Sequence, residues 1–432
     1  MKRRRKAIIA CMLCASMTAG LLAGCGKESD EGGKGDKVTL TLAASQNWIV
    51  DVDRELAEAF EEETGIAIDF QLSPDDQYQT IVKSKLNTGE GPDIFMSYSG
   101  TKLRDFNPAK NMVDLSDEEW VDQLEQWAID GNSLDGKLYA QNTAGVDDTN
   151  GILYKKDVFE RLNISIPTNY EEFKQVCDTL QENGITPIYE FVKDLWHTHY
   201  WMEGASALAL QSDPDLYEKL NTNEIGFADV PEYVEALEQL QEMESAGYFG
   251  ENHMSNIYDN SYAALENEEY GMIIIHGSYP NEMQQNIETV NPDDYGMFPS
   301  PLVDNQYVTL TAGGTTKCIN ANSDHVEEAK EYFDFLAREE NLEKLYAEKT
   351  TYVSSSMKGI EASPTQAYTE LTDMAAGEAQ GAEASVLFYD GNKISELCQE
   401  MFVGSLSPKQ VLEEFDEYRR AMAKDAGQEG FE

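Results

Sequence analysis

The chain has 432 residues, a length that exceeds one ordinary hydrophobic core and predicts two domains. Its 80 acidic residues outnumber 32 lysines and arginines and give a formal net charge of −48 at pH 7. So acidic a surface repels nucleic acid and anionic phosphates, which excludes a nucleic-acid partner and indicates a neutral or cationic ligand.

The N-terminus has the layout of a secretory signal peptide. Basic residues in MKRRRK precede the apolar run AIIACMLCASMTAGLLAG. The run ends in Leu22-Ala23-Gly24-Cys25, which resembles a bacterial lipobox, whose cysteine is lipidated and becomes the first mature residue. We therefore expect residues 1–24 to be a lipoprotein signal peptide and Cys25 to anchor an extracellular protein to the cell membrane. Residues 25–36, rich in glycine and charge, are expected to form a flexible tether.

The three cysteines of the body, Cys177, Cys318 and Cys398, are odd in number and widely spaced. Such spacing fits neither a disulfide framework nor a zinc site. They are interpreted as buried small hydrophobic residues.

The first part of the body alternates strands with helices. Strands are predicted at 37–45, 66–72 and 92–98, and helices at 51–65 and 76–89. This order is typical of an open α/β sheet, in which ligands bind at the carboxyl ends of the strands. The rule selects Gln46, Asn47 and Trp48 after the first strand and Tyr98 at the end of the third. Their amide and aromatic groups suit a hydroxyl-bearing ligand, and a surface cap is the alternative interpretation of Trp48.

The alternation continues along the chain. Further strands are predicted at 185–191 and 270–280, and further helices at 231–247, 322–348 and 407–425. The strand at 270–280 opens into Gly277-Ser278-Tyr279, and the small Gly277 would let a ligand approach the backbone. Tyr279 is therefore a further candidate contact, whereas His276 is interpreted as a strand residue hydrogen-bonded inside.

The segment WHTHYW, residues 196–201, holds two tryptophans and two histidines. A metal site would need further ligands, but the other histidines lie in unrelated elements and no HExxH or Cys/His cluster is present. The indole of Trp196 can cover the apolar face of a sugar ring, and His197 can reach a hydroxyl at its rim. Of Tyr200 and Trp201, at least one is expected to turn into the core.

Several segments resemble the extracellular solute-binding proteins of sugar-importing ABC transporters, of the maltose-binding kind. They include LNTGEGPDIFMSYSG, the stretch from LDGKLY to NYEEF, GMIIIHGSYP and MFVGSLSPKQVLEEF, and they span nearly all of the mature chain. Tyr279 is a departure, since many relatives carry tryptophan there. The resemblance implies an α/β, two-lobe periplasmic-binding-protein-like fold of type II, with a ligand cleft between the lobes.

The resemblance also implies lobe boundaries. The N-terminal lobe would comprise residues 37–146 and 313–355, and the C-terminal lobe residues 147–312 and 356–432. Three crossings, near Val146, Ala312 and Ser356, would form the hinge.

Further site residues follow from the family pattern. Asp147, with Asp148 beside it, falls where a carboxylate binds the sugar, although a solvated acidic loop explains both residues equally. Gly313 and Gly314 lack the spacing of a phosphate-binding loop. The resemblance implies that they form a hinge-side loop whose backbone nears the sugar. Phe388 falls on an aromatic sugar contact, with core packing as the alternative.

The predicted function is capture of a neutral oligosaccharide by lobe closure and delivery to ABC permease subunits. We expect a monomer that binds no cofactor or metal and performs no chemistry of its own. Two alternatives stay open: an extracellular carbohydrate-acting enzyme, since acid pairs are abundant, and a surface receptor or scaffold without a transport role.

Overall fold

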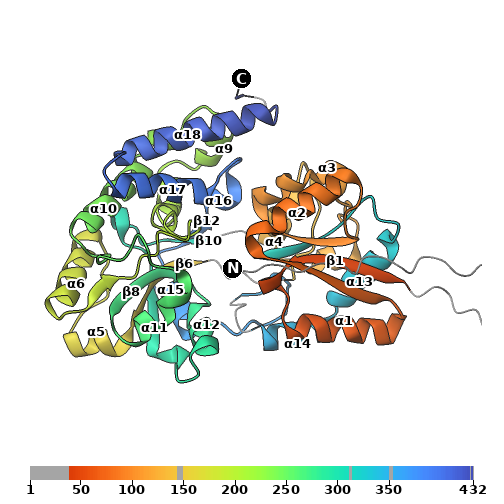
Figure 1. Cartoon of the computed structure of the whole chain (residues 1–432), viewed down its shortest axis with the longest axis horizontal. Coiled ribbons are helices and arrows are strands. Elements are labelled where there is room, and N and C mark those ends of the chain that lie inside the picture. The colour runs from red at the N-terminus through yellow and green to blue at the C-terminus, as the bar shows by residue number, and fades with distance from the viewer. Residues whose placement is uncertain (1–37, 144–148, 311–313, 350–353, 429, 432) are drawn as a thin grey trace, which may run out of the picture. The chain divides into compact units, whose positions relative to one another are not determined.

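The structure is a computed structural model that describes residues 38–143, 149–310, 314–349, 354–428 and 430–431 (Figure 1). The predicted signal peptide, the tether and Cys25 lie outside the described residues, as do Asp147, Asp148 and Gly313. No helix in the described part of the chain is both long and apolar enough to cross a membrane.

The first sheet has four strands in the order β11-β3-β1-β2. They are β1 (Thr39–Ser45), β2 (Ala67–Ser73), β3 (Ile94–Tyr98) and β11 (Thr315–Ile319). The first three are parallel and confirm the predicted strand-helix order, whereas β11 returns from far along the chain and runs antiparallel to β3. The carboxyl end of β3 therefore meets the start of β11, where Thr315 pairs with Tyr98.

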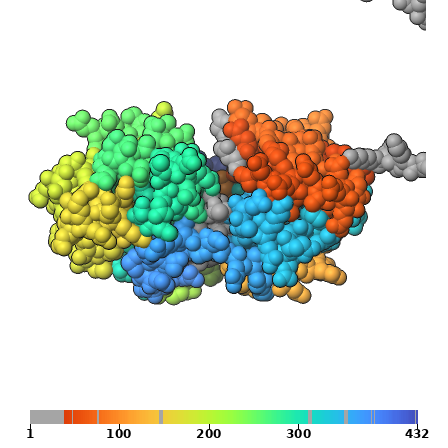
Figure 2. Space-filling model, turned by 90° about the horizontal axis from the view of Figure 1, so that it is seen from below, coloured from red at the N-terminus to blue at the C-terminus, as the bar shows by residue number. Residues whose placement is uncertain are grey.

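Both faces of this sheet are covered. Leu42 faces a core formed with α1 (Asp51–Thr64), α13 (Val326–Leu336) and α14 (Glu339–Glu348). Its neighbour Ala43 faces a second core with α2 (Asp75–Thr88), because successive side chains of a strand point to opposite faces. The segment that carries β11, α13 and α14 borders the N-terminal segment that carries β1 and α1 in both views (Figures 1 and 2).

The second sheet also has four strands, in the order β7-β8-β6-β9. They are β6 (Asn150–Lys155), β7 (Thr186–Ile188), β8 (Tyr270–His276) and β9 (Tyr295–Phe298). In β8, Ile274 packs into a core with α6 (Tyr170–Glu182), α10 (Pro231–Ser245), α17 (Gly391–Phe402) and α18 (Pro408–Asp425). Ile273 and Ile275 pack on the other face with α11 (Ser261–Glu266), α12 (Tyr279–Asn286) and α15 (Gln366–Met374).

Shorter elements complete the described chain. The helices are α3 (Pro108–Asn111), α4 (Gln126–Gly131), α5 (Lys156–Leu162), α7 (Tyr200–Glu203), α8 (Ser206–Ser212), α9 (Leu216–Asn221) and α16 (Ala382–Ser385). Two two-stranded sheets pair β4 (Ser133–Leu134) with β5 (Lys137–Leu138) and β10 (Val308–Leu310) with β12 (Glu378–Gln380). Short 3-10 helices are η1 (Gln46–Trp48), η2 (Gly100–Phe106), η3 (Glu119–Gln123), η4 (Phe227–Asp229), η5 (Tyr258–Asn260), η6 (Pro292–Asp294) and η7 (Leu302–Asp304).

Two predicted elements differ from the structure. The single helix predicted at 322–348 is two helices, because Arg338 has extended backbone. Its guanidinium forms two hydrogen bonds with the Glu63 carboxylate, at 2.9 and 3.0 Å, which holds the break against α1. The strand predicted at 270–280 ends at His276, and α12 begins at Tyr279.

The strands of each sheet lie within the segments predicted for one lobe, but the lobe boundaries stay a prediction. The crossings near Val146 and Ala312 lie outside the described residues. Near the third, Met357 is buried in the first core and Ala362 packs against the same core. The Ser356 hydroxyl also donates to the Asn142 carbonyl. The chain thus still packs on the first core at Ala362, and the crossing near Ser356 stays a prediction.

Candidate ligand-binding site

Aromatic residues gather at the carboxyl end of the first sheet. Trp48, half-buried in η1, has its ring 5.1 Å from that of Tyr98 with the planes 77° apart. A second contact, to the Tyr78 ring, is 5.1 Å at 69°. Tyr78 is buried and anchored, since its hydroxyl donates to the Met96 carbonyl at 2.6 Å. Burial raises the pKa of this phenol, which keeps it neutral.

The structure brings several predicted site residues to this end of the sheet. Tyr98 is 41% exposed, and Gln46 is exposed beside Trp48. Gly314 lies next to them, because its carbonyl accepts the Ser99 amide at 3.3 Å. The φ of Gly314 is 59°, a left-handed conformation that favours glycine. The side chain of Asn47 lies outside the described residues, as does Gly313.

A second aromatic group surrounds Trp196, beyond β7 in the second sheet. The indole is half-buried, and its ring is 5.1 Å from Tyr258 with the planes 73° apart. Phe191 and Tyr200 make two further edge contacts, at 5.1 Å with the planes 63° apart and at 5.9 Å with the planes 65° apart. Such edge contacts are the preferred geometry of aromatic pairs and hold the indole from several sides. Trp196 is therefore a partly exposed ring on a rigid support.

His197 turns the other way, contrary to its predicted role at a sugar hydroxyl. The imidazole is fully buried, with Nδ1 3.0 Å from Glu190 Oε1 and Nε2 2.7 Å from the Ile274 carbonyl. The Phe191 ring stacks on it at 3.7 Å. Both ring nitrogens are engaged inside the protein, so His197 has none to offer a ligand in this structure.

Trp201 is the residue of the WHTHYW segment that turns into the core. It is fully buried, and its indole N–H donates to Glu190 Oε2 at 2.8 Å. Tyr200 stays half-buried beside Trp196. The prediction that at least one of the two turns inward is confirmed.

A polar group that sequence reasoning missed lies beside Trp196, at the carboxyl end of β8. The Tyr258 hydroxyl donates to Glu282 Oε2 at 2.5 Å, and the Ser278 hydroxyl donates to Oε1 at 3.1 Å. His276 closes the group, with Nδ1 2.8 Å from the Ser278 oxygen. The side chains of Glu282 and His276 are 23% and 14% exposed. The available signal was the spacing: Ser278, the residue before α12, and Glu282 in its first turn are four residues apart, which places them on one side of the helix start.

Tyr279, a predicted ligand contact, belongs to the core. It is fully buried, its hydroxyl pairs with that of Ser261, and its ring stacks on Tyr262 at 5.2 Å. Because β8 ends at His276, Tyr279 is the first residue of a helix rather than the last of a strand. Its side chain consequently packs against α11 and leaves none of its surface to a ligand.

Phe388, the other predicted aromatic contact, is half-buried in the loop before α17, with a φ of 58°. Its ring lies 6.5 Å from that of Phe431. The neighbouring Leu387 carbonyl accepts from Arg419 on α18. These contacts support the core-packing alternative.

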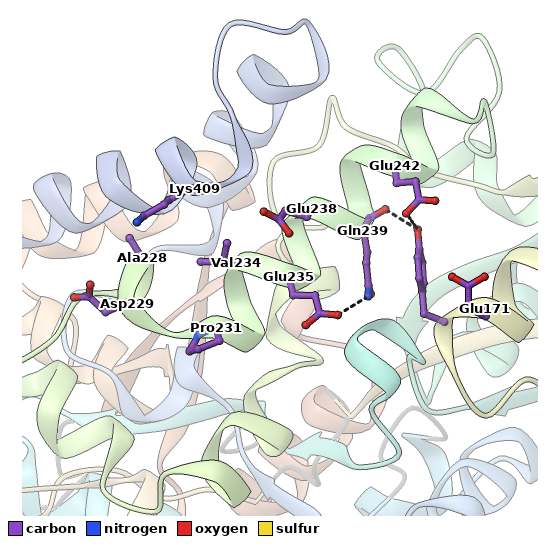
Figure 3. A pocket seen from close by; sticks show the side chains of 11 residues that line it. Glu171, Ala228, Asp229, Pro231, Val234, Glu235, Glu238, Gln239, Glu242 and Lys409 are labelled. Atoms are coloured by element: carbon purple, nitrogen blue, oxygen red, sulfur yellow. Dashed lines mark hydrogen bonds between the residues drawn. The ribbon is translucent and has the colours of Figure 1, made fainter.

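The second lobe also carries an open groove, whose lining residues belong to neither aromatic group (Figure 3). It lies along α10 and is lined by Tyr170, Glu171, Ala228, Asp229, Pro231, Val234, Glu235, Glu238, Gln239, Glu242 and Lys409. The Tyr170 hydroxyl is 3.2 Å from a Glu242 carboxylate oxygen. The groove is acidic and Tyr170, its one aromatic ring, is buried, so it lacks an exposed ring for a sugar.

Within the described residues, no cluster of three or more His, Cys, Asp or Glu side chains could hold a metal ion. Cys177, Cys318 and Cys398 are buried free thiols, which confirms their interpretation as small hydrophobic residues. Burial raises the pKa of each thiol, so none is a reactive thiolate.

The sequence model of the family described as bacterial extracellular solute-binding protein matches residues 49–343. The chain belongs to this family, whose members bind solutes outside the cell. It is 22% identical over 367 residues to the multiple sugar-binding protein of Streptococcus mutans, covering 82% of this chain and 84% of that one. It is also 22% identical over 360 residues to the melibiose/raffinose/stachyose-binding protein MelE of Bacillus subtilis, covering 79% and 80%.

Solved structures share the fold. A sugar transporter protein of Bacillus licheniformis, solved in complex with stachyose, superposes with a TM-score of 0.68 at 19% identity. The match covers 88% of this chain and 99% of that chain. The two-lobe α/β fold of the type II solute-binding proteins, predicted from the sequence, is confirmed.

Proposed function

We propose that this protein captures a neutral oligosaccharide outside the cell and delivers it to the permease subunits of an ABC importer. The names of both relatives, which refer to sugars, support this ligand class. The observation that carries the proposal is the corner formed by Trp196 and Tyr258 beside the Glu282 carboxylate.

The chemistry of that corner suits a sugar ring. A pyranose has an apolar C–H face, which an indole covers, and a rim of hydroxyl groups. A carboxylate such as Glu282 accepts hydroxyl hydrogens in charge-assisted bonds, and the partly exposed His276 beside it adds a second polar group. Trp48, Tyr98 and Gln46 would offer the corresponding surface on the N-terminal lobe.

Lobe closure would move the sugar out of water and shift an open–closed equilibrium toward the closed form. The protein itself would perform no reaction and would act as a monomer, held at the cell membrane by a lipid on Cys25. The predicted signal peptide and the lipobox-like Leu22–Cys25 support this location, and Asp147 and Gly313 in the predicted crossings would add sugar contacts.

The proposal is tested by titration calorimetry of the mature protein against neutral oligosaccharides of different linkage and length, including raffinose and stachyose. Amino acids and polyamines serve as controls. We expect saturable binding of at least one oligosaccharide and recovery of that sugar intact. Failure of every sugar to bind would overturn the proposal, and conversion of the sugar to products would favour the carbohydrate-acting enzyme.

The lipid anchor has its own test. In cells that express the full chain, the protein is expected in the membrane fraction, and Cys25→Ser is expected to move it to the soluble extracellular fraction. Equal membrane retention of both forms would contradict the anchor.

A further inference from the structure

The Glu282 carboxylate is the centre of the polar group beside Trp196. It lies in the first turn of α12, and its side chain is 23% exposed. The Tyr258 hydroxyl donates to Oε2 at 2.5 Å, and the Ser278 hydroxyl donates to Oε1 at 3.1 Å. Among the described residues no lysine or arginine forms an ion pair with Glu282, and the nearest basic atom is His276 Nδ1, 3.5 Å from Oε1. The donors that the protein supplies to this carboxylate are therefore two hydroxyl groups.

The hydrogen bonds fix the directions in which the hydroxyl protons point. A carboxylate can only accept, so the single protons of Tyr258 and Ser278 both point at Glu282. The Ser278 oxygen also lies 2.8 Å from His276 Nδ1. Because the Ser278 proton is already used, Nδ1 must carry a proton and donate to this oxygen. This order holds for the neutral and for the charged imidazole, since a proton on Nδ1 is compatible with both.

The oxygen atoms that Glu282 and Tyr258 leave open are acceptors. A carboxylate offers about four lone-pair positions, and the Tyr258 and Ser278 hydroxyl groups occupy two of those on Glu282. The Tyr258 oxygen, whose proton is held by Glu282, presents only lone pairs in other directions. Ser278 is 2% exposed, so its hydroxyl does not reach a ligand. Glu282 and Tyr258 can therefore accept a hydrogen bond from a ligand, but neither can donate one.

A group of acceptors distinguishes between substituents of a sugar ring. A free hydroxyl that faces Glu282 donates a charge-assisted hydrogen bond. A methoxy oxygen, an acetyl ester or a fluorine at the same position brings a lone pair against the carboxylate and leaves the acceptor without a partner. A site that pairs with a hydroxyl of its ligand rejects an analogue that lacks the donor, because its own polar group is then unpaired.

We propose that Glu282 is a specificity-determining residue, which restricts the corner to a sugar unit with a free hydroxyl group at the position that faces the carboxylate. This inference rests on the proposed function and adds the substitution state of the ligand: a unit that is methylated or acetylated at that hydroxyl is excluded. The rings of Trp196 and Tyr258 cover the apolar face of a pyranose whatever its substituents, so they do not make this distinction.

The test measures the affinity of the unmodified protein for raffinose and stachyose and for analogues of each, in which one hydroxyl at a time is replaced by fluorine or by an amino group. Fluorine is close to a hydroxyl in size but cannot donate. At the position that faces Glu282, the fluorine analogue is expected to bind about tenfold more weakly than its parent sugar, or more weakly still, because a hydrogen bond to a charged acceptor is lost. The amino analogue at that position donates and is expected to bind at least as tightly as the parent.

Glu282→Gln identifies the residue that makes the distinction. Glutamine keeps the shape of the side chain and one acceptor oxygen for Tyr258, but its amide group adds N–H donors. The penalty for fluorine at the position that faces residue 282 is therefore expected to disappear in this variant, while binding of the amino analogue weakens. A matched carboxylate is Glu266 of α11, which accepts the Tyr295 hydroxyl at 2.7 Å. Glu266→Gln is expected to keep the affinity ratios of the unmodified protein.

The outcomes separate this inference from the proposed function. If a parent sugar binds and every fluorine analogue binds equally well, the inference is overturned while the proposed function stands. A fluorine penalty that persists unchanged at every position in Glu282→Gln assigns the selectivity to other residues and also overturns the inference. The same loss of selectivity in Glu266→Gln would show that it comes from the fold in general. Failure of both parent sugars to bind would contradict the ligand class from which the inference starts, before any analogue is measured.

Discussion

Trp196 and Tyr258 lie 5.1 Å apart with their ring planes at 73°, although 62 positions of sequence separate them. The Tyr258 hydroxyl is in turn held by Glu282 on α12. The candidate sugar site thus combines a ring from the loop after β7, a ring from η5 and a carboxylate from the helix after β8. Three variants test this arrangement and the residues assigned around it, and a fourth tests the pH dependence of stability.

Trp196→Ala removes the proposed stacking surface. We expect sugar affinity to fall by about 1–3 kcal/mol, the range for aromatic stacking on planar ligands, with circular dichroism unchanged. Trp127 is the control, since it is half-buried on α4 and packs against the first core. Trp127→Ala should lower the melting temperature and leave the affinity as it was. Equal affinity of Trp196→Ala and the unmodified protein in calorimetry would contradict the site.

Glu282→Gln removes a charged acceptor. Affinity is expected to fall by up to about 1.5–3 kcal/mol, the range for a hydrogen bond to a charged group. A matched pair exists in the same lobe, where the Tyr295 hydroxyl donates to Glu266 at 2.7 Å. Glu266→Gln should therefore reduce stability alone. A similar loss of affinity in both variants would show that Glu282 acts through the fold, not through the ligand.

Tyr279→Phe tests whether Tyr279 is a core residue rather than a ligand contact. Because the Tyr279 hydroxyl is buried against Ser261, its removal should cost about 1 kcal/mol of stability, seen as a lower denaturation midpoint. Sugar affinity should not change. A weaker affinity with unchanged stability would restore Tyr279 as a ligand contact.

The buried Glu203 predicts a pH dependence of stability. Burial, with the nearby Glu383 charge, raises the pKa of Glu203 from 4.5 to about 7. Between these values the folded state binds more protons than the unfolded state, so the free energy of unfolding falls as pH rises. The loss, about 3 kcal/mol for a shift of this size, is complete above about pH 7. Glu203→Gln should remove this slope in denaturant unfolding at pH 5 to pH 8, and an unchanged slope would assign it to other groups.

Much of the fold followed from local patterns. The alternation in KVTLTLAAS predicted β1, and the strand-end rule placed Trp48 and Tyr98 at one edge of a sheet, where their rings meet. The hydrophobic period and the order of the strands suffice to place these two residues, because neighbouring parallel strands end at the same edge of a sheet. The helix at 407–425 was likewise predicted, and Ser407 caps it as its Ser-Pro start indicates.

The predictions that differ from the structure concern segments whose side chains follow no regular hydrophobic period. Residues 192–199 form turns and bends, so neighbouring side chains have no fixed alternation. Trp196 turns outward and His197 inward, and the sequence offers no local signal for that difference. Tyr279 was misplaced for a related reason: an apolar strand followed by a glycine does not show whether a helix starts two residues later.

The sequence alone determined the acidic composition, the order of strands and helices and the family. These depend on composition, local periodicity and short motifs, which need no knowledge of distant contacts. Only the tertiary structure decided which aromatic residues face outward. His197 is held by Glu190 and by the carbonyl of Ile274, 77 residues away, and Trp196 by Tyr258. Side-chain direction in an irregular segment is set by such distant partners, since the backbone there imposes no period.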